Sequence, residues 1–274
     1  MKKYKSSKVL SFVIACLLSL SYSVPAFAAE TENGNVIDQT TSNDYNQVIG
    51  MTDEQALGYF NEFLALQPNS ISAETNITQQ TLDDFAQYAV ENGIIDDTPE
   101  QRGAITKAVV RAEFAVVVAG GKIAGFTTAA ALLDHSLQDS PSNLNYGATS
   151  TYAAQIANSS ECQQIVNDFK TYVSGKHLSA RTTTGSTTLD STTDLHLAYN
   201  NVSYVASGTK TNGVWNLTIT FNDTYDFETQ AWENAMTDSA VVTILNNYAA
   251  YAQSIGAIVP YNIKVTVNAT FTEN

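Results

Sequence analysis

The chain has 274 residues, and its 27 acidic residues outnumber its 13 basic residues, which gives a formal net charge of −14. A surface this acidic repels phosphate backbones and anionic lipid headgroups, so nucleic-acid binding and electrostatic attachment to membranes are both disfavoured. Because 44% of the residues are hydrophobic, the chain can bury a sizeable core in one or two domains. The charge leaves open an enzymatic activity on small or neutral substrates.

Residues 1–28 have the order of a cleaved secretory signal: four lysines, an apolar run from Val9 to Leu20, and then Ala26-Phe27-Ala28. We therefore expect a secreted, extracellular protein that starts at Ala29. Cleavage removes four basic residues and no acidic residue, so the net charge falls to −18. Val13-Ile14-Ala15-Cys16 also fits the pattern that precedes a lipid-modified cysteine, and a lipid anchor through Cys16 stays an alternative.

Cys162 is the only cysteine after residue 28, so no internal disulfide can form and the fold depends on its core. The most apolar later stretch runs from Ala112 to Leu133, but it contains Glu113 and Gly120-Gly121-Lys122. A membrane-spanning helix needs about twenty apolar residues. We therefore expect no transmembrane segment in the mature chain.

Residues 29–50 are rich in polar side chains and predict a flexible leader. Thr52-Asp53-Glu54-Gln55 has the spacing of a capping box, which predicts a helix near 53–66. The apolar stripe of residues 77–91 predicts a second helix, with Gly93 placed to end it in a left-handed conformation.

Thr98-Pro99 predicts the start of a third helix that runs to Gly120. We expect a fourth helix over about 122–138, after the glycine pair, and a fifth over about 161–173. Residues 51–175 are therefore predicted to form a helical domain.

From Arg181 onward the apolar period changes from about 3.6 residues to 2, so residues 176–274 are predicted to form a sheet domain. The stretch 182–189 is predicted to be extended, and 194–207 to be a strand with a β-bulge at Asn200-Asn201. Asn212-Gly213 favours a tight hairpin turn.

The strand after that turn alternates cleanly through Trp215, Leu217, Ile219 and Phe221. A helix is expected at about 238–254, followed by a last strand with one apolar face that starts at Tyr261. The predicted class is α+β: an N-terminal helical region, then an antiparallel sheet crossed by one helix.

Chemistry is best supported at the end of the hairpin, where Asn222–Phe227 places Asp223, Tyr225 and Asp226 within four residues. If the chain turns there, Asp223 and Asp226 can converge on one cation, and paired carboxylates are typical of an Mg²⁺ site. The structural alternative is that Asp226 caps a turn while Tyr225 and Phe227 pack at the end of the hairpin.

A base for this site is the second requirement. His135 is the candidate, because it follows Asp134 near a helix end and a carboxylate can orient an imidazole ring. A partly buried structural role for His135 is the alternative.

Three short segments follow one another in a fixed order in the last third of the chain. They are Gly213-Val214-Trp215, then Asn222-Asp223-Thr224-Tyr225-Asp226-Phe227, and, after a helix and before a last strand, Ser254-Ile255-Gly256-Ala257-Ile258-Val259-Pro260-Tyr261. This series resembles the C-terminal toxin domain of colicin M-like bacteriocins. The resemblance covers about residues 180–271 and implies a partly open, β-barrel-like sheet. It also implies Mg²⁺-dependent cleavage of lipid II, the undecaprenyl-pyrophosphate-linked peptidoglycan precursor.

The resemblance assigns Asp223, Tyr225 and Asp226 to the active site. It also places that family's catalytic His-Arg pair at Trp232-Glu233, where this chain has neither residue. We therefore expect a secreted, bacteriocin-like effector that acts on a component of the cell envelope. The alternatives are a non-catalytic binding protein that retains the toxin-like fold and, third, a self-protection protein paired with a secreted toxin.

Overall fold

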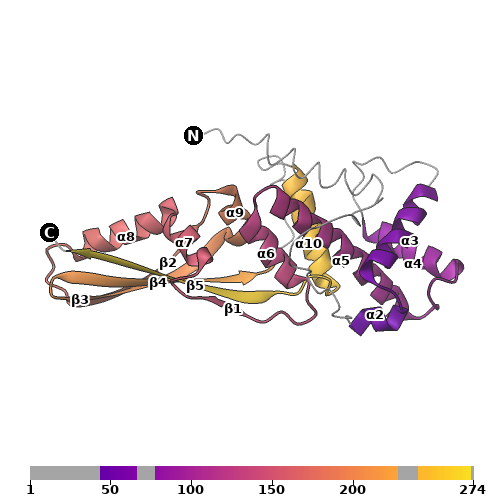
Figure 1. Ribbon diagram of the computed structural model, residues 1–274, viewed down its shortest axis with the longest axis horizontal. Coiled ribbons are helices and arrows are strands. Elements are labelled where there is room, and N and C mark those ends of the chain that lie inside the picture. Colours follow the sequence, from indigo (N-terminus) through magenta and orange to yellow (C-terminus); the bar gives the residue numbers. More distant parts are fainter. Residues whose placement is uncertain (1–43, 67–77, 228–239, 273–274) are drawn as a thin grey trace, which may run out of the picture. The chain divides into compact units, whose positions relative to one another are not determined.

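The computed structural model describes residues 44–66, 78–227 and 240–272, with side chains from residue 247 onward in the last range. The chain is α+β: N-terminal helices come first, and a five-stranded, mixed, open sheet follows (Figure 1). The signal sequence, Cys16 and most of the expected leader lie outside the described residues.

The described residues form two compact units. The helical unit consists of the described residues up to Gly120, of Leu137–Asp139, and of the described residues between Phe227 and Val259. The sheet unit consists of Gly121–Ser136, Ser140–Asp226 and the described residues from Pro260 onward. These units differ from the expected division at residue 175, because several helices of the expected helical domain belong to the sheet unit.

The helical unit contains α2 (Asp44–Ile49), α3 (Asp53–Leu66), α4 (Gln79–Glu91), most of α5 (Pro99–Ile123) and α10 (Ala240–Ser254). The predicted capping box of α3 is confirmed, because the backbone N–H of Thr52 donates to the Gln55 amide and that of Gln55 donates to the Thr52 hydroxyl. Gly93 has a φ of 67°, as predicted for the end of α4. The rings of Phe60, Phe63 and Phe85 pack together between α3 and α4.

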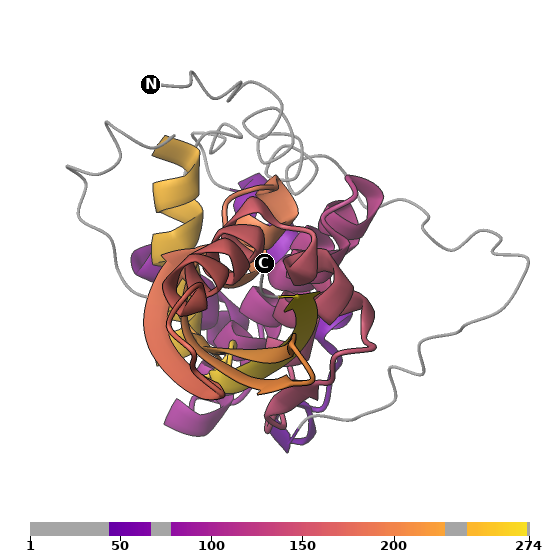
Figure 2. The same cartoon turned by 90° about the vertical axis from the view of Figure 1, so that its left-hand side faces the viewer.

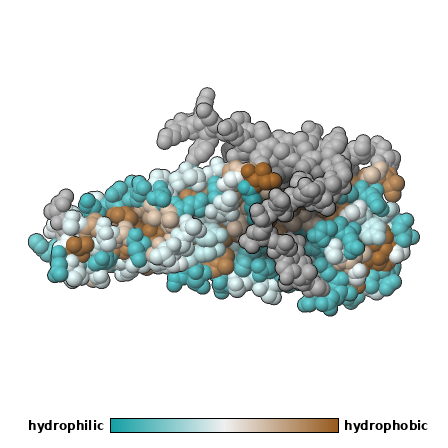
Figure 3. All heavy atoms as spheres, in the orientation of Figure 1, coloured by the Kyte–Doolittle hydropathy of each residue, from teal (hydrophilic) through white to brown (hydrophobic). Residues whose placement is uncertain are grey.

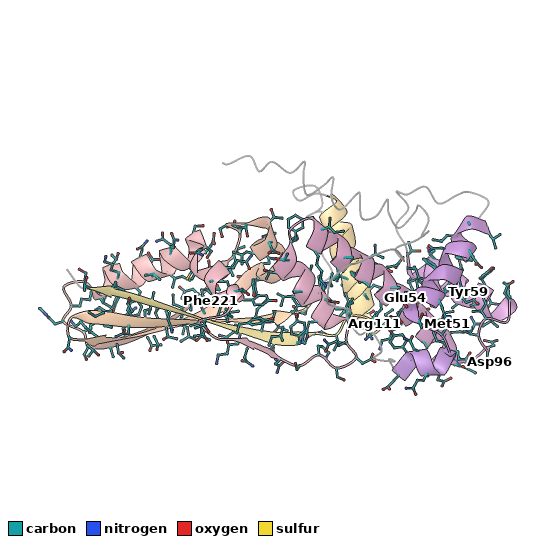
Figure 4. All side chains as sticks on the ribbon, viewed as in Figure 1. Met51, Glu54, Tyr59, Asp96, Arg111 and Phe221 are labelled. Carbon is teal, nitrogen blue, oxygen red and sulfur yellow. The ribbon has the colours of Figure 1, made fainter. Side chains whose placement is uncertain are left out.

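Arg111 of α5 is buried and connects three parts of the helical unit (Figure 4). Its guanidinium donates to the carbonyl of Ala257 over 2.9 Å and forms a 2.9 Å ion pair with Asp139. Tyr248 of α10 stacks on Phe114 and donates its hydroxyl hydrogen bond to Glu113. The predicted helix at 238–254 therefore exists, but it belongs to the helical unit, where we expected it to cross the sheet.

Three predicted segments in the first half have wrong boundaries: the leader, the third helix and the fourth helix. Asp44–Ile49 is helical where the flexible leader was expected, since it buries Tyr45 and Ile49. Helix α5 continues through Gly120-Gly121 to Ile123, because glycine is compatible with helical backbone angles and Gly121 allows a close approach to Ala130. The break comes at Gly125, with a φ of 86°, and the fourth predicted helix is shorter than expected, at Thr127–Ser136 (α6).

The sheet unit has strands β1 (Leu144–Tyr146), β2 (Ala180–Thr188), β3 (Asn201–Thr211), β4 (Val214–Tyr225) and β5 (Tyr261–Thr272), in the order β1-β5-β4-β3-β2. Strands β2 to β5 are antiparallel, as predicted. The short β1 was not predicted, and it pairs in parallel with β5, so the sheet is mixed.

Helices cover one face of this sheet (Figures 1 and 2). They are α6, α7 (Thr151–Ala157), α8 (Ser160–Val173) and α9 (Thr193–Tyr199), and α7 was missed by the sequence analysis. Figure 3 shows hydrophobic side chains of this unit in a band between helices and strands, with hydrophilic side chains to either side. The odd-numbered residues of β4 from Trp215 to Phe221 are buried, as their alternation predicted.

The predicted strand over 194–207 is wrong in its first half, which forms helix α9. Thr192 caps this helix by accepting from the N–H of Leu195. The buried carboxylate of Asp194 accepts from the N–H groups of Thr128 and Ala129 at the start of α6. Asn200, with a φ of 45°, ends the helix where a bulge had been expected.

The Asn212-Gly213 turn is confirmed, because both residues have positive φ values, 51° and 79°. No helix in the described part of the chain is long and apolar enough to cross a membrane.

Gly208 of β3 provides a test of packing between helix and sheet. A Cβ at this position would lie 2.7 Å from Phe169 of α8 and 3.2 Å from Trp215 of β4. We expect Gly208→Ala to lower the free energy of unfolding by about 1–3 kcal/mol, measured by urea unfolding with circular dichroism.

Gly58→Ala is the matched control, because Gly58 is exposed within α3 and no atom lies within 4 Å of the added Cβ. That change should stabilise the chain by about 0.5–1 kcal/mol. Equal effects of the two substitutions would contradict the packing described for Gly208.

Candidate functional site

The residues predicted to carry chemistry lie at the end of β4. Asp223 and Tyr225 share the helix-covered face of the strand with Phe221, while Asn222 and Thr224 are exposed on the other face. Tyr225 is buried, Asp223 is half-buried, and Asp226 is exposed just after the strand ends. The sequence therefore places a carboxylate within the apolar pattern of a strand, where most acidic residues would be unfavourable.

Five tyrosines of the sheet unit surround this part of the strand, and we call them the tyrosine cluster. Tyr225 lies directly opposite Tyr261 on β5, with ring centroids 5.3 Å apart. Tyr146 and Tyr152 stack at 3.9 Å, and their charges, if ionised, would act on both Tyr199 and Tyr261. The cluster comprises Tyr146, Tyr152, Tyr199, Tyr225 and Tyr261.

Burial raises the pKa of Asp223 from its ordinary value of 3.8 to about 7. A hydrogen bond from the Thr224 backbone lowers this pKa, and the negative charge of Asp226 raises it. At neutral pH the carboxyl group is therefore close to half ionised, so it can both take up and release a proton. The charge of Asp223 in turn raises the pKa of Tyr199 and Tyr225, beyond the larger effect of their burial.

His135 lies at the end of α6, and its ring packs edge-on against Tyr261 at 4.7 Å. Since Tyr261 stacks on Tyr225, the structure brings His135 to the same cluster as Asp223. The ring is held by a 2.8 Å hydrogen bond between Nε2 and the carbonyl of Ser142. A carbonyl only accepts, so Nε2 carries the hydrogen of this bond.

The expected partner of His135 has another interaction. Asp134 forms a 2.9 Å ion pair with Lys122, because the two side chains face each other between the end of α5 and α6. The ring-orienting group that the structure provides is thus the Ser142 carbonyl, seven residues along the chain.

Tyr199 was missed as a site residue, because the sequence analysis placed it in a strand. It is 4% exposed, and its hydroxyl has no hydrogen-bond partner in the described part of the chain. A buried hydroxyl without a partner is unfavourable and marks a position where a ligand group or water can bind. The capping pattern of Thr192 and Asp194 was the sequence feature that could have identified helix α9 and the true position of Tyr199.

A pocket of about 380 Å³ lies beside Asp223 in the sheet unit. Its lining is mostly amide and hydroxyl groups from β1, β3, β4 and β5, and Lys264 is its one basic residue. The lining residues are Asn143, Leu144, Asn145, Ser203, Asn222, Asp223, Thr224, Asn262, Ile263 and Lys264.

The predicted magnesium site would rest on Asp223 and Asp226 alone. Within the described residues, no group of three or more His, Cys, Asp or Glu side chains is placed to hold a metal ion. The negative charge of Asp226 nevertheless acts on Asp223, so a cation near both would relieve their repulsion. Two carboxylates fit an Mg²⁺ ion that keeps several waters, which is its usual coordination in phosphate-binding sites.

Cys162 is unsuited to nucleophilic chemistry, and the other two positions considered in the sequence lie outside the described residues. Cys162 is buried, and burial raises the pKa of its thiol to about 11, so little reactive thiolate forms. Trp232 and Glu233, where the resemblance places a His-Arg pair, lie outside the described residues.

Comparisons of the chain with models of protein families, with curated proteins and with solved structures gave no match.

The raised pKa of Asp223 predicts a pH-dependent stability. Because the pKa of Asp223 is higher in the folded than in the unfolded state, its ionisation opposes folding. The resulting loss of unfolding free energy is complete above pH 7 and declines as the pH falls toward 4. Asp223→Asn stays neutral, so its gain in unfolding free energy over the wild type should be larger at pH 8 than at pH 5, by on the order of 2 kcal/mol.

Urea unfolding at both pH values measures this difference. Asp168→Asn is the control, since it removes one exposed carboxylate from α8 of the same unit. The burial described for Asp223 is contradicted if both substitutions give the same gain at the two pH values.

The two buried phenols Tyr199 and Tyr261 should respond differently to loss of the hydroxyl. Tyr261→Phe removes a 2.8 Å hydrogen bond to the Leu132 carbonyl and should cost about 0.5–1.5 kcal/mol. Tyr199→Phe removes an unpaired hydroxyl and should leave stability unchanged or raise it by up to about 1 kcal/mol. Thermal or urea unfolding compares the two; a larger loss for Tyr199→Phe would show that its hydroxyl has a partner.

Proposed function

We propose that this protein is a secreted, bacteriocin-like effector whose sheet unit acts on a component of the cell envelope. The observation that carries the proposal is the half-buried carboxyl of Asp223, which lies on the helix-covered face of β4 near Tyr199 and Tyr225 and whose pKa burial raises to about 7. Its sequence context, Asp223-Thr224-Tyr225-Asp226-Phe227 before a helix and a last strand, resembles that of a colicin M-type domain. The proposed substrate is a lipid-linked peptidoglycan precursor such as lipid II, and the finer form of the fold is a partly open, barrel-like sheet.

The geometry supports general acid–base chemistry by Asp223. In its ionised form this carboxylate can accept a proton from an attacking hydroxyl or water, and in its neutral form it can return one to a leaving group. His135 is the second candidate base, because its ring packs against Tyr261 on the other side of the Tyr225–Tyr261 pair.

The phenols of the cluster are suited to a different task. Burial raises the pKa of Tyr199 and Tyr225 above the ordinary value of 10, so both stay protonated at neutral pH. A neutral phenol can donate a hydrogen bond to negative charge that develops on a reacting phosphoryl oxygen. Tyr199 is the better placed donor, since its hydroxyl has no partner among the described residues.

Asp223 and Asp226 are the residues that would hold Mg²⁺. When bound, the ion supplies positive charge for pyrophosphate oxygens, which an acidic chain of this kind otherwise repels. The protein's own part is to hold the two carboxylates at the end of β4, with the phenols of Tyr199 and Tyr225 near Asp223.

A non-catalytic binding protein with a toxin-like fold is the second proposal. Trp232 and Glu233 favour it, because neither residue can replace the His-Arg pair that the resemblance places there. Glu233 would repel a pyrophosphate.

The two proposals are separated by incubating the mature protein with lipid II and Mg²⁺. An effector of the first kind releases a pyrophosphoryl product, and chelation of the metal stops the release. Asp223→Asn should slow this release at least about 100-fold, as expected for loss of a general acid–base group.

Asp168→Asn serves again as the control and should keep the wild-type rate, because it removes an exposed charge on α8. Stoichiometric binding of lipid II without turnover would reject the enzymatic proposal and support the binding protein. No binding and no turnover would reject lipid II as the target of both.

A further inference from the structure

The face of the sheet opposite the helices has an unusual composition, and we call it the polar face. Threonine, serine and asparagine occupy every outward position of the strands, with the exceptions of Ala180, Val205, Val214 and Lys264. The polar positions are Asn145 of β1, Thr182, Thr184, Ser186 and Thr188 of β2, Asn201, Ser203, Ser207, Thr209 and Thr211 of β3, Asn216, Thr218, Thr220, Asn222 and Thr224 of β4, and Asn262, Thr266, Asn268, Thr270 and Thr272 of β5.

Charge is depleted on this face. The chain has 27 acidic residues, yet none lies at an outward position of the five strands, and Lys264 is the one basic residue there. Exposed strand positions in an acidic protein would ordinarily carry some of that charge, which also protects against aggregation. The polar face therefore presents uncharged donors and acceptors to solvent.

Many of these groups are fixed by contacts between neighbouring strands. The hydroxyl of Thr218 donates to the side chain of Asn268 over 3.1 Å, and that of Thr224 donates to Asn262 over 3.1 Å. Thr182 and Ser207 also share a hydrogen bond. Side chains that are already ordered lose less conformational entropy when a ligand binds, so the polar face is pre-organised for hydrogen bonding.

The pocket of about 380 Å³ opens among these residues, where β1, β3, β4 and β5 lie side by side. Apart from Leu144, Asp223 and Ile263, every lining residue is an asparagine, serine, threonine or lysine. Its volume falls within the range of small-ligand sites, of about 300–1,000 Å³.

We propose that this pocket binds an uncharged glycan, and specifically a chain of N-acetylated amino sugars. Amide and hydroxyl side chains both donate and accept, which matches the hydroxyl and acetamido groups of such sugars. Lys264 is the one charged side chain on this face, because the side chain of Asp223 points to the helices; this fits a neutral ligand and disfavours a nucleic acid or another polyanion, which needs several cations. Aromatic side chains are missing from the polar face, so a protein partner would lack the anchors that dominate most protein interfaces.

The probe for this site is tetra-N-acetylchitotetraose, titrated calorimetrically into the mature protein. We expect saturable binding that Asn222→Ala weakens at least about tenfold, since Asn222 lines the pocket. Asn216→Ala is the matched control: it makes the same change on the same face of β4 but lies away from the pocket, and it should alter the affinity less than about twofold.

A second titration, with inorganic pyrophosphate, tests the charge of the ligand. Lys264→Gln removes the basic residue of the pocket and should reduce oligosaccharide binding less than about threefold. The proposal is overturned if the wild-type protein binds pyrophosphate but not the oligosaccharide and if Lys264→Gln abolishes the pyrophosphate binding. The pocket would then be an anion site. No saturable sugar binding, or equal effects of Asn222→Ala and Asn216→Ala, would also overturn it. Sugar binding needs no turnover, so it can hold even where lipid II hydrolysis fails.

Discussion

The register of β4 is the constraint on which the rest of the sheet unit depends. This strand pairs along its whole length with β5 and, from Val214 to Asn222, with β3 as well, so its residues alternate strictly between two faces. Odd-numbered residues from Trp215 to Tyr225 point to the helices, and even-numbered residues from Asn216 to Thr224 form part of the polar face. A slip of one residue would exchange the two sets, so burial of Trp215 and Phe221 also fixes the position of Asp223.

Helix α6 is held at both of its ends, at its start by α9 and near its end by the strand that pairs with β4. At its start, the carboxylate of Asp194 accepts from two backbone N–H groups, where the helix dipole favours negative charge. Near its end, the hydroxyl of Tyr261 donates to the carbonyl of Leu132, and His135 packs against the ring of the same tyrosine. The position of His135 is thus set by β5, whose Tyr261 lies opposite Tyr225. Contacts from two distant parts of the chain bring the imidazole to the tyrosine cluster.

Local patterns were enough to predict the elements whose ends carry strong sequence markers. Thr52 with Gln55, Gly93, and the Asn212-Gly213 turn each satisfy a local hydrogen-bonding or backbone requirement, and the structure has the expected ends there. The same holds for the alternation of β4.

The failures share a different cause, which is dependence on contacts distant in sequence. Leu195, Leu197 and Tyr199 alternate like a strand, but Asp194 finds its partners more than sixty residues earlier and stabilises a helix instead. Strand β1 is three residues long and pairs with a strand near the end of the chain, so its own sequence carries little evidence of it. The tyrosine cluster gathers residues from β1, α7, α9, β4 and β5, and only Tyr225 of the five could be nominated from a local motif.

Glu113 and Asp223 both have a pKa that burial raises, and their settings lead to different interpretations. Glu113 is almost fully buried in the helical unit, where burial raises its pKa to about 8 and the hydroxyl of Tyr248 donates to it. A neutral glutamic acid with a phenol partner, packed beside Phe114, is a satisfied structural group. Asp223 is only half-buried, and its charge acts on Tyr199, whose hydroxyl has no partner in the described chain. A group that opposes folding in its charged form, and is left accessible, is the arrangement expected where stability has been given up for function.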